Sequence, residues 1–216
     1  MRIKQNIALR EITEQDVDVL YNLMITIYPA AYSFLWPDNG AWYINEQYSK
    51  TNVLKELKQE KANYYFVVVD NEIIGNFRIV WNKPLKNLQI VNQVKLHRLY
   101  LHEKVQGKGV GKAIMNWLEK EALRKDYKAI WLDAMDAKLQ AFEFYKKLGY
   151  KYHAHVFLPF SYNISQNALT GRYLSQSRGS SIFSCSSAFA SASFTLLVAT
   201  ICQCCFPSHL GFFANQ

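Results

Sequence analysis

The chain has 216 residues, of which 50% are apolar and 15% are aromatic, and this composition excludes an intrinsically disordered protein. The 25 basic side chains outnumber the 17 acidic ones, which gives a net charge of +8. Only Arg178 among the charged residues lies beyond residue 174, so the positive excess belongs to residues 1–174. These residues contain no long basic run, and we therefore expect a small anionic ligand and no nucleic acid as partner.

All four cysteines lie at or beyond residue 185, so neither a disulfide framework nor a zinc site holds the main body together, and no metal is expected. The N-terminus lacks the apolar stretch of a secretory signal peptide, and we expect a cytoplasmic protein. Residues 175–216 are rich in Ser and Cys. We expect one domain over residues 1–174 and a disordered or non-integral tail over 175–216; a membrane anchor in the tail is the alternative, which its Ser, Thr and Gln content opposes.

The first half of the chain alternates between amphipathic and β-branched stretches. In chain order we expect a strand over 3–10, a helix from 13 to 27, a helix over 46–61, and an antiparallel hairpin of strands 64–69 and 73–81. Thr13 is the candidate N-cap of the first helix, and Pro29 is expected to end it. Residues 28–48 hold seven aromatic side chains around a Pro-Asp-Asn-Gly turn.

Strands and helices alternate in the second half. We expect strand 94–101, a helix to about 124, strand 129–132, helix 138–148, strand 150–157 and a closing strand near 169–174. Gly149 is placed to terminate the second of these helices. Because a hairpin precedes the alternating part, the sheet is predicted to be mixed, which favours a three-layer α/β sandwich over a doubly wound fold.

A glycine-rich segment, Gln-Gly-Lys-Gly-Val-Gly-Lys at residues 106–112, separates a predicted strand from an amphipathic helix. Its three glycines allow backbone N–H groups to point at a ligand, and the helix dipole adds positive charge there. Lys108 and Lys112 add full charges, so the segment predicts a pyrophosphate site. The spacing fails the Walker A pattern; a Rossmann-type dinucleotide site and a glycine-rich helix start without ligand remain as alternatives.

The stretch 99–111 resembles the acyl-CoA-binding motif of the GNAT acetyltransferase superfamily, in which Gln/Arg-x-x-Gly-x-Gly/Ala follows a strand. Residues 144–150, Phe-Tyr-Lys-Lys-Leu-Gly-Tyr, are similar to a second family motif, Phe-Tyr-x-x-x-Gly-Phe/Tyr. The segment 35–43 is similar to sequences of one branch of this superfamily, the bacterial spermidine/spermine acetyltransferases. The resemblance implies a GNAT-like three-layer α/β sandwich with a central mixed, largely antiparallel sheet, and acetyl-CoA as co-substrate without a metal.

The resemblance also implies roles for single residues. Tyr145 would protonate the departing thiolate, and a half-buried core tyrosine is the alternative. The strand that ends at Leu101 would splay from its parallel neighbour, and the pantetheine arm would lie in the gap. The implied acetyl-CoA-binding residues are Leu99, Leu101, Gln106, Gly107, Lys108, Gly109, Val110, Gly111, Lys112 and Lys138.

The general base and the acceptor pocket are less clearly marked. His97 titrates near neutrality and could take the proton of the amine, or it could be a strand histidine satisfied by a neighbour. Trp36 and Tyr43 are the candidate acceptor-binding residues, because aromatic rings with Asp38 and Glu46 nearby could hold an alkylammonium. The alternative is that most of these rings pack helices onto the sheet.

We therefore expect an acyl-CoA-dependent N-acetyltransferase that acts on a primary amine of a small, polyamine-like molecule or of a protein, by direct attack on the thioester. A homodimer is compatible with this expectation. The alternative from another class is a non-catalytic CoA-binding or membrane-tethered regulatory module.

Overall fold

A computed structural model describes residues 1–86, 88–157 and 170–177. The predicted tail over 175–216 lies outside the described residues, apart from its first three. Within the described ranges no helix has the length and apolarity needed to cross a membrane.

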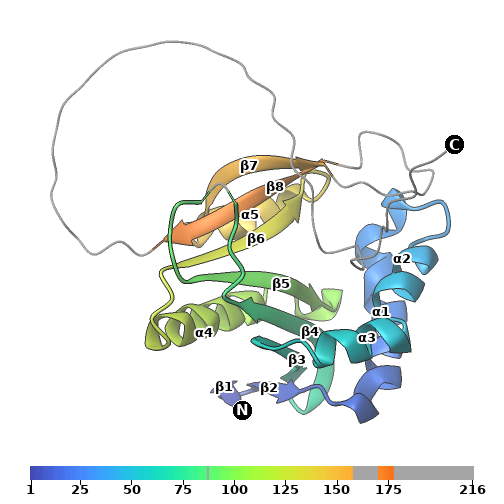
Figure 1. Ribbon diagram of the computed structural model, residues 1–216. Coiled ribbons are helices and arrows are strands. Elements are labelled where there is room, and N and C mark those ends of the chain that lie inside the picture. The colour runs from blue at the N-terminus through green and yellow to red at the C-terminus, as the bar shows by residue number, and fades with distance from the viewer. Residues whose placement is uncertain (87, 158–169, 178–216) are drawn as a thin grey trace, which may run out of the picture.

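A mixed sheet of eight strands forms the centre of the molecule, in the order β1-β2-β3-β4-β5-β6-β8-β7 (Figure 1). The strands are β1 (Arg2–Lys4), β2 (Ile7–Glu11), β3 (Ala62–Val69), β4 (Glu72–Trp81), β5 (Gln93–Leu101), β6 (Ala129–Met135), β7 (Lys151–Phe157) and β8 (Thr170–Ser177). Only β5 and β6 run parallel, and every other neighbouring pair is antiparallel. The expected mixed, largely antiparallel sheet is confirmed.

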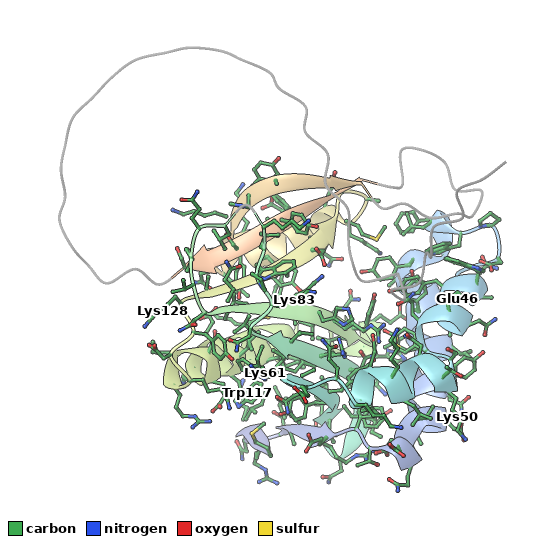
Figure 2. The ribbon with its side chains drawn as sticks, viewed as in Figure 1. Glu46, Lys50, Lys61, Lys83, Trp117 and Lys128 are labelled. Atoms are coloured by element: carbon green, nitrogen blue, oxygen red, sulfur yellow. The ribbon has the colours of Figure 1, made fainter. Side chains whose placement is uncertain are left out.

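Helices cover both faces of this sheet, which confirms the three-layer α/β sandwich (Figure 1). They are α1 (Val17–Tyr32), α2 (Ala41–Gln47), α3 (Lys50–Leu57), α4 (Val110–Arg124) and α5 (Leu139–Lys147), with 3-10 turns η1 (Glu14–Asp16), η2 (Ser33–Leu35) and η3 (Glu103–Val105). The first three helices share one buried cluster with β3, and α4 and α5 share the other. Trp117 of α4 illustrates the second: its ring centroid lies 5.9 Å from those of Tyr65 and Phe77, edge-on to both (Figure 2).

Several element boundaries differ from the sequence prediction. The strand expected over 3–10 is a hairpin of two strands, β1 and β2. The first helix does not end at Pro29 but continues to Tyr32, and the Ser33 amide at its end donates to the Pro29 carbonyl. Proline removes one N–H from the helical ladder and its ring crowds the carbonyl four residues earlier, and burial of Ile27 and Tyr28 beside it offsets this cost.

The helix expected over 46–61 is divided into α2 and α3. Ser49 lies between them in an extended conformation, and its hydroxyl accepts the Asn52 amide at 3.3 Å as the N-cap of α3. Thr13, the predicted N-cap of the first helix, is instead the N-cap of η1, the 3-10 turn before it, and Asp16 is the N-cap of α1; Asp16 accepts the Thr13 amide at 2.9 Å. The closing strand β8 also extends to Ser177, three residues beyond the end expected at Leu174.

Candidate active site

The parallel strands β5 and β6 separate part-way along their length. They pair only where Gln93–Leu96 face Ala129–Leu132. Beyond this point β5 stays with β4 as far as Leu101, and β6 stays with β8 as far as Met135. We call this divergence the β5–β6 opening. Along this opening, the backbone groups of β5 that face β6 have no hydrogen-bond partner on β6, and those of β6 that face β5 have none on β5.

Leu99 and Leu101 lie on the β5 edge of this opening. The amide of His102 donates to the Ile74 carbonyl of β4 at 2.8 Å. Successive residues of a strand direct their backbone groups to opposite edges. Leu101 and Leu99 therefore direct N–H and C=O away from β4, toward the opening, where an extended ligand arm could bind as an additional strand.

The glycine-rich segment lies at the end of β5, after η3. Gly107 and Gly109 have φ of 75° and 77°, in the left-handed region that favours glycine, and Gly109 is the N-cap of α4. A Cβ built on either glycine would meet no atom within 4 Å. The backbone there faces open space, and the first-turn amides of α4 have no intrahelical acceptor. This geometry fits an anionic group held by amides.

Some side chains of the segment face solvent, where a ligand could bind, and others pack against the protein. Gln106, Lys108 and Lys112 are exposed, so their side chains are accessible to a bound anion. Val110 is buried in the core. A Cβ at Gly111 would lie 3.2 Å from the Phe144 ring, so this glycine permits close packing of α4 against α5. Val110 and Gly111 can therefore offer a ligand their backbone only.

Tyr145 lies on α5 and is buried beside Phe144 and Tyr150, with ring-centroid distances of 5.0 and 5.7 Å. Its carbonyl accepts the Tyr150 amide at 3.1 Å across the turn that Gly149 makes with φ of 88°. Burial, with a smaller effect of Tyr32, raises the pKa of the Tyr145 hydroxyl above its usual range. The hydroxyl is protonated at neutral pH, as that of an exposed tyrosine also is, and the raised pKa makes it the weaker acid of the two.

His97 is the extra residue of a β-bulge at the opening, because Arg78 pairs with Arg98 while Ile79 pairs with Leu96. Its Nδ1 lies 2.7 Å from Nη1 of the buried Arg78. A guanidinium only donates hydrogen bonds, so Nδ1 accepts and the ring proton resides on Nε2. Burial and the surrounding cations lower the pKa of His97 well below its usual value. Of the two roles considered, a strand histidine satisfied by a neighbour is the one that this contact supports.

A buried ionic network continues from Arg78 toward the helices. Glu56 of α3 accepts a hydrogen bond from Arg98 Nη1 at 2.6 Å and lies 3.6 Å from Arg78 Nε. Arg98 also donates to the Tyr64 hydroxyl at 3.1 Å and to Gln47 Oε1 at 3.2 Å. The network therefore fixes α2 and α3 to the bulged part of β5.

The aromatic residues 28–48 form a packed cluster on the same side. Tyr43 stacks on Tyr28 with centroids 4.5 Å apart, and its hydroxyl lies 3.1 Å from that of Tyr100 on β5. Trp36 donates to the Tyr28 hydroxyl at 3.0 Å. Both candidate acceptor residues, Trp36 and Tyr43, are buried in this cluster. Phe34, with 61% of its surface exposed, is accessible to a ligand instead.

The two carboxylates expected near these rings have different surroundings. Asp38 accepts the amides of Gly40 and Trp42 at 3.0 and 2.6 Å and so stabilises the start of α2. Glu46 is exposed on the outer side of α2 (Figure 2). Among the described residues, no group of His, Cys, Asp and Glu side chains has the arrangement of a metal site.

Lys138 does not lie on the glycine-rich segment. It is the N-cap residue of α5, and its ammonium nitrogen lies 4.9 Å from the ring centroid of Tyr32 and 5.1 Å from that of Phe34. The cation is therefore on the aromatic side of the opening, and contact with CoA phosphates stays an untested prediction.

Sequence analysis did not single out Arg78, Glu56, Tyr32 or Tyr100. An arginine within the apolar run 73–81 is itself a signal, because a charge in a buried strand needs a partner. The partner could not be identified, since Glu56 is one of several acidic residues in an amphipathic helix. Tyr32 was counted among seven equivalent aromatics.

A model of the acetyltransferase (GNAT) family matches residues 19–150. An uncharacterized N-acetyltransferase encoded in the pepI 3′ region of Lactobacillus delbrueckii subsp. lactis is 22% identical over 123 residues, which cover 56% of this chain and 71% of that protein.

Solved structures with the same fold include enzymes crystallised with coenzyme A. The PaiA N-acetyltransferase of Thermoplasma acidophilum in complex with coenzyme A has a TM-score of 0.62 and 20% identity, and the match covers 81% of this chain and all of that one. The spermidine/spermine N-acetyltransferase SpeG of Vibrio cholerae, crystallised in mutant forms, has a TM-score of 0.56 and 13% identity, with 81% of this chain and 95% of that one covered. At these identities the similarity concerns the fold.

Proposed function

The chain belongs to the GNAT acetyltransferase family, and we propose that it transfers the acetyl group of acetyl-CoA to an amine by direct attack on the thioester. The observation that carries this proposal is the position of the glycine-rich segment at the end of β5, next to the β5–β6 opening. An elongated ligand with a pyrophosphate at one end and a reactive group at the other needs an anion site and, next to it, an opening that holds the rest of the ligand.

The residues present fit acetyl-CoA. The space in front of Gly107 and Gly109 and the free first-turn amides of α4 suit a pyrophosphate, with Lys108 and Lys112 beside them. The outward backbone groups of Leu99 and Leu101 suit the amide groups of a pantetheine arm. Acetyl-CoA supplies the activated acetyl group when bound.

The chain's own groups would act on protons and on developing charge. A backbone amide on the β5 edge would stabilise negative charge on the thioester oxygen. Tyr145 would donate its proton to the departing thiolate, since its hydroxyl is protonated at neutral pH. The amine must lose a proton first, and the low pKa of His97 favours release to water over transfer to this ring.

We propose a primary amine of a small molecule or of a protein as the acceptor. The aromatic cluster beside the opening, with the exposed Phe34, supports an acceptor that carries an apolar or cationic chain. The similarity to a spermidine/spermine acetyltransferase of the same fold supports a polyamine-like acceptor among these. A cytoplasmic location and a homodimer stay predictions.

Release of CoA thiol over a panel of amines tests the proposal against a non-catalytic CoA-binding module. The panel contains spermidine, an N-terminal peptide amine and a lysine side chain in a peptide. We expect thiol release above the acetyl-CoA blank with at least one amine, and saturation with its concentration. Calorimetric binding of acetyl-CoA without release for any amine would favour the binding module.

We also propose that residues 1–177 are sufficient for this activity. All buried core residues of the described structure lie before Ser177, where β8 ends. Truncation after Ser177 should keep the turnover within about three-fold of the full chain. Failure of the truncated protein to bind acetyl-CoA would place the remaining residues in the domain.

A further inference from the structure

The side chain of Lys138 extends from the end of β6 to the aromatic rings at the end of α1 and in η2. Its backbone follows β6, and its amide donates to the carbonyl of Met135, the last residue of that strand, at 3.0 Å. Its ammonium reaches the rings of Tyr32 and Phe34, at the end of α1 and in η2. A molecule that approaches the opening from this side therefore meets the Lys138 amine.

Tyr145, the proposed proton donor, lies on α5, whose N-cap residue is Lys138. Helical tyrosines point toward the helix N-terminus, so the Tyr145 hydroxyl is directed toward the end where Lys138 lies. Tyr32 connects the two, since its ring lies 4.9 Å from the Lys138 nitrogen and it is close enough to Tyr145 to affect the pKa of that residue.

The surroundings of Lys138 differ from those of Lys95 and Lys146. Lys95 pairs with Asp133 at 2.8 Å, and Lys146 pairs with Glu143 at 3.8 Å. Within the part of the chain that the structure describes, Lys138 has aromatic contacts and no carboxylate partner. Burial lowers the pKa of its amine, which increases the neutral fraction that can act as a nucleophile.

We propose that Lys138 is acetylated within its own active site, an inference that rests on the proposed acetyl transfer. The lone pair of the neutral Nζ would attack the acetyl carbon, the carbon–sulfur bond would break, and Tyr145 would protonate the thiolate. The extra proton on nitrogen goes to water, and Tyr145 regains one from water. The products are Nε-acetyl-Lys138 and CoA thiol.

Acetylation would change the charge of the opening. It removes the cation that faces an incoming acceptor, while the acetylated side chain can still pack on Tyr32 and Phe34. A positively charged acceptor would then meet less repulsion. Modification of Lys138 would therefore lower the KM for cationic amines.

Site-resolved mass spectrometry of the full chain incubated with acetyl-CoA tests this inference. We expect Lys138 to be acetylated at least ten-fold faster than Lys146, which lies on the same helix with 64% of its side chain exposed. The rate should be first-order and independent of protein concentration. Tyr145→Phe should slow acetylation of Lys138 and leave that of Lys146 unchanged, and Lys146→Arg should leave labelling of Lys138 unchanged.

Thiol release with the amine panel, measured on the same samples, separates this inference from the proposed function. Thiol release with an external amine, together with labelling of Lys138 no faster than Lys146, would overturn the inference and leave the function standing. A Lys138 rate that rises with protein concentration would overturn it as well, because the reaction would then occur between molecules. Absence of both reactions would overturn inference and function together.

Discussion

The Nδ1 atom of His97 lies 2.7 Å from Nη1 of Arg78, and this contact determines which ring nitrogen carries the proton. Arg78 cannot accept a hydrogen bond, so His97 accepts with Nδ1 and is a neutral Nε2–H tautomer. Three further cations, Arg98, Lys95 and Lys83, contribute to lowering the pKa of His97, after burial as the largest cause. The histidine at the bulge is thereby held in the neutral form, as the acceptor of the Arg78 hydrogen bond.

We predict that His97 is still neutral at about pH 6.5, where an unperturbed histidine is half protonated, because its pKa is held well below that value. Because its pKa is lowered in the folded state, the unfolded chain binds a proton there first, and stability falls as pH falls below about 6.5. His97→Gln should remove up to about 1.4 kcal/mol per pH unit from that slope. Nitrogen chemical shifts of the ring measure the tautomer, and urea unfolding at several pH values measures the slope.

A normal titration of His97 near pH 6.5 would contradict this account. It would also restore His97 as a candidate base, because a group that exchanges its proton near neutrality can accept one from the amine. A change in the pH profile of turnover on replacing His97 would have the same meaning.

Replacing Tyr145 by Phe should lower turnover at least ten-fold and leave the affinity for acetyl-CoA within two-fold. The proton donor acts mainly in the transition state, so its loss affects kcat more than ground-state binding. Tyr150→Phe is the matched control, because Tyr150 is a buried tyrosine whose ring centroid lies 5.7 Å from that of Tyr145. Equal turnover of both variants across pH 6–9 would mean that Tyr145 packs in the core and is not the proton donor.

Gly109→Ala should weaken acetyl-CoA binding at least ten-fold, and Gly109→Val should weaken it further. The added carbon would occupy the space in which the phosphates are expected, and it would strain a backbone with φ of 77°. Gly149→Ala controls for the strain, since Gly149 has φ of 88° in the turn after α5. Calorimetry that gives the same affinity for both alanine variants would reject the glycine-rich segment as the phosphate site.

Glu56→Gln should destabilise the fold by about 3–5 kcal/mol, because it leaves two buried guanidinium groups without their carboxylate. Glu60 is exposed shortly after α3, so Glu60→Gln should change the free energy of unfolding by less than about 0.5 kcal/mol. Urea unfolding measures both. A loss below about 1 kcal/mol for Glu56→Gln would mean that water or another group solvates the two arginines.

The parts of the site that could be predicted from the sequence depend on local signals. The positive φ of Gly107 and Gly109 and the helix that begins after them follow from neighbouring residues, as does the end of α5 at Gly149. The separation of β5 from β6 was expected from the family resemblance, and the register of the two strands agrees with it.

The parts that could not be predicted depend on residues distant in the chain. Arg78 and His97 meet because a bulge shifts the register of β4 against β5, and nothing in either segment indicates a bulge. Lys138 reaches Tyr32 across more than a hundred residues of sequence. Among the aromatic residues, composition cannot distinguish the buried Trp36 and Tyr43 from the exposed Phe34, since the difference depends on how α1 and α2 pack.

The most direct test of acetyl transfer follows the acetyl carbon itself. The purified chain is incubated with acetyl-CoA labelled with carbon-13 in the acetyl group and with each amine of the panel, and products are identified by mass spectrometry. We predict that the label appears on the nitrogen of at least one amine, with one acetylated amine formed per CoA thiol released. Saturable binding of acetyl-CoA with no labelled amine in any reaction would contradict the proposed acetyl transfer.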